Sequence, residues 1–235
     1  MPRFSIIIPY YNRWDLTHAR MSEIYGHLYS DIEVILVNDA SPELDCRSGA
    51  GFWQKGLNVF PIKYIENKEN LGFGGSNNRG AKAATGDILV FLSNDVVISG
   101  NFLSQIEKII VENEGKVIVG GRVLYDDTGW NTLMIKGKKS IVCYPEGWLI
   151  AVTPAMWESI GGFDPIYSPY DYEDVDLGAW ATYNNVPLVG LNSAYLHHLS
   201  GQTIYKVNPE RQKVTIAHRK LFEDKWTALF ETQFA

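Results

Sequence analysis

The stretch Glu33-Val-Ile-Leu-Val-Asn-Asp39 decides the fold. Residues 33–37 form a nearly uninterrupted apolar run rich in β-branched side chains, and the polar pair Asn38-Asp39 follows directly. A continuous apolar run of this length is typical of a strand buried on both faces, as in a parallel sheet. The stretch therefore predicts a central strand whose carboxyl end carries a carboxylate.

Three further segments repeat this pattern. The predicted strands are residues 4–8, closed by Pro9, residues 59–65, and residues 87–92, which end at Ser93-Asn94-Asp95. The predicted helices are one that Asn12 or Asp15 can cap, with Leu16, Ala19, Ile24 and Leu28 on its inner side, and two over residues 76–84 and 101–113. This alternation indicates an α/β fold with a mostly parallel central sheet flanked by helices. Such sheets bind ligands at the carboxyl ends of their strands.

The second half of the chain is less regular. It contains a Gly/Asp-rich stretch over residues 120–137, a strand over 148–152, a helix opened by Pro154, a helix over 177–183, a strand pair near Leu188 and Tyr195, and a last helix opened by Asn208-Pro209. We find no internal repeat and no linker. One domain over residues 1–235, with a smaller subregion in the second half, is the simplest prediction.

Composition and charge exclude several classes of protein. The chain has 235 residues, with 21 basic and 27 acidic side chains and a net charge of −6, which argues against non-specific binding to nucleic acid. Cys46 and Cys143 form no CxxC pair, so they predict neither a zinc site nor a disulfide framework but two buried reduced thiols. No apolar run approaches the ~18 residues of a membrane-spanning helix. We therefore expect a cytoplasmic protein without a transmembrane segment.

Polar residues gather after the predicted strands. Asp39 could accept hydrogen bonds from a base or a ribose, although an ordinary turn explains it better when it is taken alone. A glycine-rich loop over residues 70–80 runs into a helix, where amides attract phosphate, but it is neither a dinucleotide fingerprint nor a Walker loop, and a structural turn is an equal alternative. Ser93-Asn94-Asp95 could hold Mg²⁺ or Mn²⁺ together with substrate phosphates, or form a simple turn.

Two clusters in the second half favour chemistry. Asp171, Glu173, Asp174 and Asp176 place four carboxylates within six residues. Like charges so close together repel unless a cation, a helix amino terminus or a shared proton relieves them, and we favour a functional site over an acidic first helical turn. His197-His198 end a short apolar strand and offer imidazole ligands for a metal ion, with a structural role for at least one of them.

The ordered set of motifs resembles the family 2 glycosyltransferases. The motifs are Ser-Ile-Ile-Ile-Pro-Tyr-Tyr-Asn (5–12), Val-Ile-Leu-Val-Asn-Asp-Ala-Ser (34–41), Asn-Leu-Gly-Phe-Gly-Gly-Ser-Asn-Asn-Arg-Gly (70–80), Gly-Asp-Ile-Leu-Val-Phe-Leu-Ser-Asn-Asp (86–95), Ile-Gly-Gly-Phe-Asp (160–164), Tyr-Glu-Asp-Val-Asp-Leu (172–177) and His-His-Leu-Ser-Gly-Gln-Thr (197–203). The closing His-Arg-Lys-Leu-Phe-Glu-Asp-Lys-Trp (218–226) is similar to the ends of rhamnosyltransferase-like members. The resemblance spans nearly the whole chain in the right order.

This resemblance implies a GT-A fold, in which a Rossmann-like sheet binds a nucleoside diphosphate sugar. Residues 1–98 would form the donor half, residues 99–207 the acceptor and catalytic half, and residues 208–235 a C-terminal helix. The implied substrate-binding residues are Pro9, Asn12, Asp39, Asn70, Gly72, Asn77, Arg79, Asn94 and Trp148. Asp95 and His198 would bind Mn²⁺ or Mg²⁺, with His197 left open as the ligand. Asp174 would be the catalytic base and Glu173 its orienting partner, with the reverse left open.

The implied activity is that of a metal-dependent inverting glycosyltransferase. It would move a sugar from a UDP-, GDP- or dTDP-sugar to the hydroxyl of a glycan, lipid-linked or protein acceptor. Two departures support an alternative, a catalytically silent nucleotide-sugar-binding module that serves a partner enzyme: Ser93 replaces the first acid of the family's Asp-X-Asp, and Trp180 replaces an Arg after the acidic motif. We expect the last helix to pack on the domain, with a homodimer or contact with the inner membrane surface as the minority options.

Overall fold

The computed structural model describes residues 3–27, 31–46, 49, 51, 53, 59–125, 132–200 and 210–233. Several predicted features fall outside the described residues. These are Leu28 of the first helix, residues 126–131 of the Gly/Asp-rich stretch, residues 201–203 of the His-His motif, and Asn208-Pro209 before the last helix.

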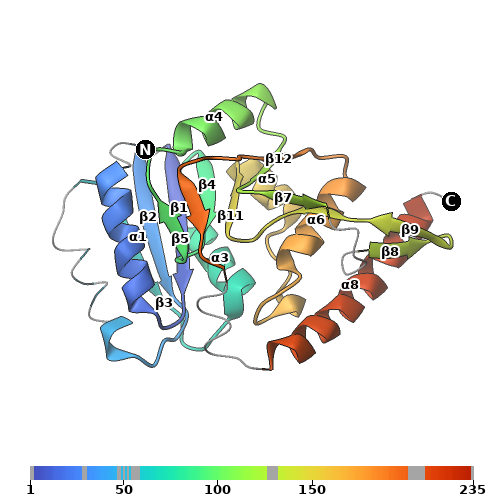
Figure 1. The fold of residues 1–235 in the computed structure, drawn as a ribbon, viewed down its shortest axis with the longest axis horizontal. Coiled ribbons are helices and arrows are strands. Elements are labelled where there is room, and N and C mark those ends of the chain that lie inside the picture. The colour runs from blue at the N-terminus through green and yellow to red at the C-terminus, as the bar shows by residue number, and fades with distance from the viewer. Residues whose placement is uncertain are drawn as a thin grey trace.

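A seven-stranded sheet in the order β12-β6-β11-β4-β1-β2-β3 forms the centre of the molecule (Figure 1). Its strands are β1 (Phe4–Tyr10), β2 (Ile32–Asn38), β3 (Ile62–Glu66), β4 (Ile88–Leu92), β6 (Ile118–Gly120), β11 (Leu149–Val152) and β12 (Leu188–Gly190). Every neighbouring pair is parallel except the two made by β11, which runs antiparallel to β4 and β6. The prediction of an α/β fold with a mostly parallel sheet is confirmed.

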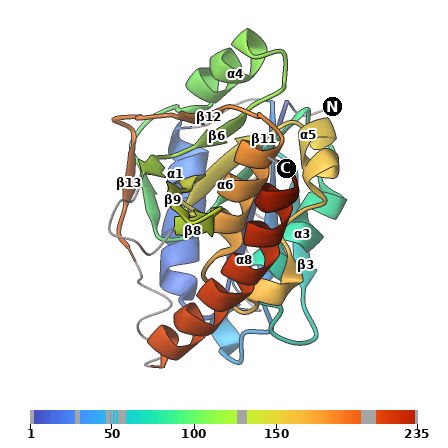
Figure 2. The ribbon, with the colours of Figure 1, turned by 90° about the vertical axis from the view of Figure 1, so that its right-hand side faces the viewer.

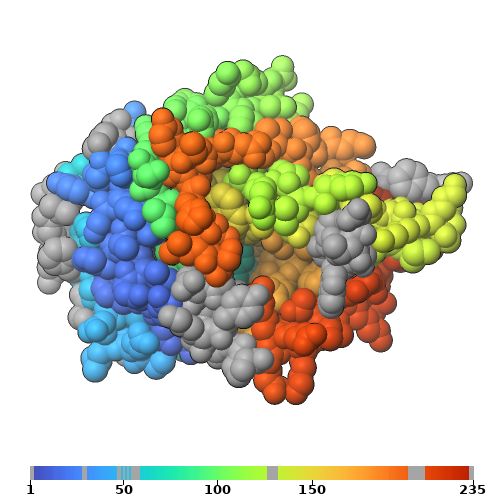
Figure 3. Space-filling model, viewed as in Figure 1, coloured from blue at the N-terminus to red at the C-terminus, as the bar shows by residue number. Residues whose placement is uncertain are grey.

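Helices cover both faces of the sheet (Figures 1 and 2), and the described residues also form three separate two-stranded sheets. The helices are α1 (Trp14–His27), α3 (Gly72–Ala83), α4 (Leu103–Glu112), α5 (Pro154–Ile160), the 3₁₀ turn η1 (Pro165–Tyr167), α6 (Glu173–Tyr183) and α8 (Arg211–Gln233). The antiparallel pairs are β5 (Val96–Ile98) with β13 (Leu196–His198), β7 (Val123–Tyr125) with β10 (Cys143–Pro145), and β8 (Thr132–Ile135) with β9 (Lys138–Ile141). The β8–β9 hairpin projects from the body (Figure 3). Within the described ranges, no helix has both the length and the apolar character that crossing a membrane requires.

The apolar run of β1 serves two cores because successive side chains point to opposite faces of a strand. Ile6 packs on the face that α1 and α4 cover, whereas Ile7 packs on the face that α3, α5 and α6 cover. A third cluster lies between α6 and α8 and includes Tyr172 and Phe222. The prediction that the last helix packs on the domain is therefore confirmed for α8.

The largest correction concerns the glycine-rich segment. A glycine-rich loop over residues 70–80 and a helix over residues 76–84 were predicted, but α3 already begins at Gly72. Gly72 has a φ of +74°, and a Cβ there would lie 2.3 Å from the carbonyl oxygen of Pro169. A contact with a residue so distant in sequence sets the helix start, which local pattern alone does not reveal.

Other boundaries also differ. β1 continues through Pro9 because its pairing with β2 continues there, although its ladder with β4 ends at Ile7. The third strand begins at Ile62 rather than at residue 59, and the helix predicted over 101–113 spans Leu103–Glu112. The strands near Leu188 and Tyr195 do not pair with each other, since β12 pairs with β6 and β13 with β5.

Two burial predictions were also wrong. The inner side of α1 is formed by Thr17, Arg20, Met21 and Ile24, whereas Leu16 and Ala19 are only half-buried. Arg20 can face inward because its guanidinium donates to the buried Val96 carbonyl and to the half-buried Glu23 carboxylate. Cys46 is buried as predicted, but Cys143 is half-buried.

A buried carboxylate ties three strands of the sheet together. Glu33 is 1% exposed and accepts hydrogen bonds from the Ser5 hydroxyl at 2.6 Å and from the amide and hydroxyl of Thr85 at 2.6 and 2.9 Å. The Lys63 ammonium lies 2.8 Å from its other oxygen. Burial alone would raise the pKa of Glu33, but Lys63, Ser5 and Thr85 together hold it below the usual value.

We predict that Glu33→Gln lowers the free energy of unfolding by about 1–3 kcal/mol at pH 7, because the buried donors lose their anionic acceptor. A carboxylate with a lowered folded-state pKa stabilises the protein above its unfolded pKa of about 4.3, and this stability is lost as the pH falls through the folded pKa. The difference in the free energy of unfolding between the wild type and the variant should therefore become smaller at acidic pH. Urea unfolding at several pH values measures it. Glu112→Gln, which removes an exposed ion pair, is the matched control. An equal loss of unfolding free energy in both variants would contradict the prediction.

Candidate active site

A cavity of about 420 Å³ lies at the carboxyl ends of β1, β2 and β4. Its described lining consists of Pro9, Tyr10, Tyr11, Asp39, Asn70, Gly72, Phe73, Ser93, Asn94, Asp95, Gly147, Trp148, Pro169, Tyr170, Asp171, Glu173, Asp174, His198 and Arg211. All the predicted site residues except Asn12, Asn77 and Arg79 are among them. The strand ends thus bring together residues from both halves of the sequence, as expected for a parallel sheet.

One wall of the cavity is built by the pairing of β5 with β13. The register sets His198 opposite Val96, the residue after Asp95. His198 Nε2 therefore lies 3.3 Å from Asp95 Oδ1, and the amide of Leu199 donates to the Asp95 carbonyl at 3.0 Å. The Ser93 hydroxyl donates to the same carboxylate at 2.6 Å. His197 is exposed, so the structure sets His198 rather than His197 beside the acid.

Two further side chains, Trp148 and the buried Arg20, lie next to the Asp95–His198 pair. The Trp148 ring stacks on His198 with ring centres 5.5 Å apart, and its Nε1 donates to Glu146 at 2.9 Å. Arg20 is 2% exposed, and its guanidinium donates to the Val96 carbonyl and to Glu23. Its positive charge attracts the Asp95 carboxylate. The sequence analysis missed Arg20, since it expected an apolar inner side for this helix.

Asp39 joins the end of β2 to the start of α3. Its Oδ1 accepts from Asn67 at 2.7 Å and from the Leu71 amide at 2.8 Å, and its Oδ2 accepts from the Gly72 amide at 2.9 Å. A negative charge is favourable at this position because unpaired amides collect at a helix amino terminus. Asp39 thus has a structural role in addition to the predicted contact with the donor.

Three predicted donor-site residues do not line the cavity in the described structure. The Asn12 backbone amide donates to the Ser41 hydroxyl at 2.8 Å. Asn77 is fully buried in α3 and donates to the Phe73 carbonyl at 3.0 Å. Arg79 donates to the Glu66 carbonyl at 3.2 Å. Because α3 starts at Gly72 rather than at Ser76, Asn77 and Arg79 both lie about one turn further from the start of the helix than predicted.

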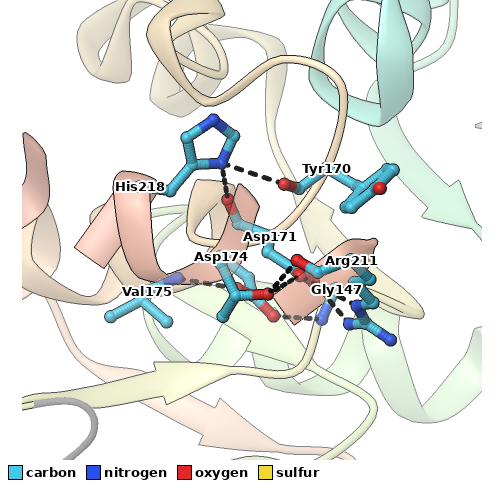
Figure 4. A network of polar contacts seen from close by, with 8 residues as sticks. Gly147, Tyr170, Asp171, Asp174, Val175, Arg211 and His218 are labelled. Carbon is cyan, nitrogen blue, oxygen red and sulfur yellow. Dashed lines mark hydrogen bonds and ion pairs between the residues drawn. The ribbon is translucent and has the colours of Figure 1, made fainter. Parts of the chain in front are cut away.

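The two predicted catalytic acids open α6 in different environments, and Figure 4 shows that of Asp174. Asp174 accepts from the Gly147 amide at 3.0 Å and from the Val175 amide at 2.9 Å. Burial raises its pKa to about 6, and these two amides limit the rise. Burial and the nearby Asp174 raise the pKa of Glu173 well above its usual value. Glu173 is 5% exposed, and its Oε1 has no hydrogen-bond partner among the described residues.

With a pKa of about 6, Asp174 is largely ionised at neutral pH, whereas burial disfavours the ionised form of Glu173. Only an ionised carboxylate can accept a proton from a substrate hydroxyl. The geometry therefore suits Asp174 better than Glu173 to act as a base.

The other two acids of the cluster, Asp171 and Asp176, bind residues of α8. Asp176 accepts from the Tyr167 hydroxyl at 3.0 Å and from Trp226 Nε1 at 2.6 Å, and the Lys225 ammonium lies 2.8 Å from it. Asp171 forms a bidentate ion pair with Arg211 at the start of α8 (Figure 4). Asp171 and Arg211 also line the cavity. Arg211 was not predicted, because no local signal links residues 40 positions apart.

Comparison with known proteins gives the family. The model of glycosyl transferase family 2 matches residues 5–157. The chain is 31% identical over 140 residues to a GalNAc(5)-diNAcBac-PP-undecaprenol beta-1,3-glucosyltransferase of Campylobacter jejuni, covering 59% of this chain and 43% of that protein. It is 26% identical over 132 residues to the putative glycosyltransferase EpsH of Bacillus subtilis, covering 54% and 36%. The chain thus spans less than half the length of these relatives.

Solved structures share the fold. The mannosyltransferase PcManGT of Pyrobaculum calidifontis, in complex with GDP-Man and Mn²⁺, superimposes with a TM-score of 0.63 at 20% identity, covering 80% of this chain and 54% of that one. S. aureus TarS 1–349 in complex with UDP gives a TM-score of 0.60 at 19% identity, covering 83% and 60%. These likenesses confirm the GT-A fold. Because the family model covers more than half of the sequence, the chain belongs to glycosyl transferase family 2.

Proposed function

We propose that the chain is a metal-dependent inverting glycosyltransferase that moves a sugar from a nucleoside diphosphate sugar to an acceptor hydroxyl. One observation carries the proposal: a carboxylate–imidazole pair, Asp95 with His198, and the half-buried base Asp174 line one cavity, although they come from three distant segments. The GDP-Man and UDP in the complexes of PcManGT and TarS support a nucleotide as the common ligand.

The charge of the cavity supports a bound cation. Its described lining carries five carboxylates, Asp39, Asp95, Asp171, Glu173 and Asp174, and a single arginine. A diphosphate would be repelled there unless a cation compensated its charge. Asp95 and His198 supply one hard oxygen ligand and one imidazole, a donor set that suits Mn²⁺ or Mg²⁺.

Asp95 and His198 would hold the ion from one side. No group of three or more His, Cys, Asp or Glu residues suited to a metal occurs in the described ranges, so phosphate oxygens and water would complete its coordination. The ion would stabilise the negative charge that gathers on the departing diphosphate. Ser93 replaces a second carboxylate here and donates to Asp95 instead, which keeps that acid in place.

Asp174 would remove the proton from the acceptor hydroxyl. The acceptor oxygen then forms a bond with the anomeric carbon as the bond to the diphosphate oxygen breaks on the opposite face, which inverts the configuration at that carbon. The strand ends of residues 1–98 would hold the donor, and residues 99–207 would present the base and the acceptor. The C. jejuni relative is named for an undecaprenol-linked glycan, so we favour a glycan acceptor, and a lipid-linked one would bring the chain to a membrane surface.

Asp174→Asn tests the base. We predict that kcat falls by about 10²–10⁴-fold, the usual worth of general base catalysis, while donor binding changes little. In the wild type kcat should rise with pH through about 6, because the raised pKa of Asp174 must be passed before it can accept a proton. The measurement is release of the nucleoside diphosphate from a panel of UDP-, GDP- and dTDP-sugars. Glu173→Gln should lose far less activity; an Asp174→Asn variant with undiminished kcat would refute the assignment.

His198→Ala tests the metal site. We predict that it abolishes the stabilisation that a nucleoside diphosphate gives in the presence of Mn²⁺, since the ion loses one of two protein ligands. A thermal-shift titration of the nucleotides with and without Mn²⁺ measures this. His197→Ala, at the exposed neighbouring position, is the matched control and should behave like the wild type. Equal stabilisation of both variants would show that His198 does not hold the ion.

A further inference from the structure

We propose that the amino-terminal half of α8 is a clamp that sets the direction of the base. In this proposal, which rests on the proposed function of Asp174, three residues of α8 are positioning residues: Arg211, Thr215 and His218. None of them needs to touch the reacting atoms, because they act on the bend that precedes α6.

That bend has an unusual backbone. Asp171 and Tyr172 both have positive φ values, 73° and 81°, in the left-handed region that residues with a Cβ avoid. Two successive residues of this kind persist only where their surroundings hold them. α6 begins directly after them at Glu173, and Tyr172, its N-cap residue, makes no side-chain cap hydrogen bond. The bend therefore decides where the first turn of α6, with Asp174, points.

Two residues of α8 hold the side chain of Asp171. Arg211 Nε donates to Oδ2 at 2.8 Å, and a second guanidinium nitrogen donates to Oδ1. The Thr215 hydroxyl donates to Oδ2 at 2.6 Å. A bidentate guanidinium–carboxylate pair fixes orientation as well as distance. Among the contacts described, only residues of α8 hold the side chain of Asp171.

His218 holds the backbone of the bend. It is 6% exposed, and its Nδ1 lies 3.0 Å from the carbonyl oxygens of both Tyr170 and Asp171 (Figure 4). Carbonyl oxygens only accept hydrogen bonds, so Nδ1 must carry the proton. One buried N–H therefore orients two successive peptide groups, and no aliphatic side chain could replace it.

α8 is attached to α6 independently of this clamp. Asp176, two residues beyond Asp174, receives the hydrogen bond of Trp226 and the ion pair with Lys225. Phe230, near the far end of α8, is buried against Tyr183 and Trp226. A change at His218 can therefore release the bend without detaching the helix.

The test compares two substitutions of His218. His218→Leu removes the N–H, whereas the side-chain amide of His218→Asn can place a donor near the position of Nδ1. We expect kcat for release of the nucleoside diphosphate to fall by about 10²-fold in His218→Leu, the effect of misplacing a catalytic group by roughly an ångström, with donor KM within about 3-fold. His218→Asn should recover most of the loss. Phe230→Leu, which weakens α8 elsewhere, should keep its kcat.

Hydrogen exchange of the peptide that contains residues 170–176 gives a second readout, independent of turnover. Exchange should be faster in His218→Leu and in Thr215→Val than in the wild type and in Phe230→Leu. Unchanged exchange, or a kcat loss in His218→Leu no larger than in Phe230→Leu, overturns the clamp. A wild-type chain that turns over no donor contradicts the proposed function instead, and the exchange result still decides whether α8 holds the bend.

Discussion

The free energy needed to bury a carboxylate organises the whole cavity. Five carboxylates line it, and each must be compensated or lose its charge. Backbone amides stabilise Asp39 and Asp174, the guanidinium of Arg211 stabilises Asp171, and a hydroxyl and an imidazole face Asp95. Glu173 has no such partner for its Oε1, and its raised pKa follows. Of the adjacent pair Glu173 and Asp174, it is therefore Asp174 whose pKa of about 6 leaves it ionised at neutral pH.

The strands and their polar ends could be predicted from the sequence because the signals are local. An apolar run such as residues 34–37 identifies a buried strand wherever the chain leads, and strand ends in a parallel sheet meet at one edge. The positions of Asp39 and Asp95 in the cavity follow from that rule. The closeness of Asp95 and His198 does not, since it depends on the register of β13 on β5, and only the resemblance to a family had paired them.

The errors share a physical cause, which is contact between distant segments. The start of α3 depends on Asp39 and on the close approach of Pro169 to Gly72. The structure buries the Asn77 side chain against the first turn of α3, which the predicted loop lacked, and the Arg79 guanidinium donates to the Glu66 carbonyl at the end of β3. Arg20 is a further error of this kind. Arginine is usually exposed, so the burial of Arg20 cannot be predicted until its contact with the Val96 carbonyl is known.

The acidic cluster shows how one short segment answers two requirements. From the sequence, its carboxylates suggested either a functional site or an acidic first helical turn. In the structure, different carboxylates of the cluster have different roles. The outer acids, Asp171 and Asp176, are bound to α8, while Glu173 and Asp174 between them face the cavity. Repulsion within the segment is lowered because the outer charges are paired with cations, and the inner pair is then held at a fixed place between two anchors. A helix far along the chain thus holds the two adjacent acids in place, while burial raises both pKa values and the amides of Gly147 and Val175 limit the rise at Asp174 alone. A base that works beside a second carboxyl group needs such a difference between the two environments.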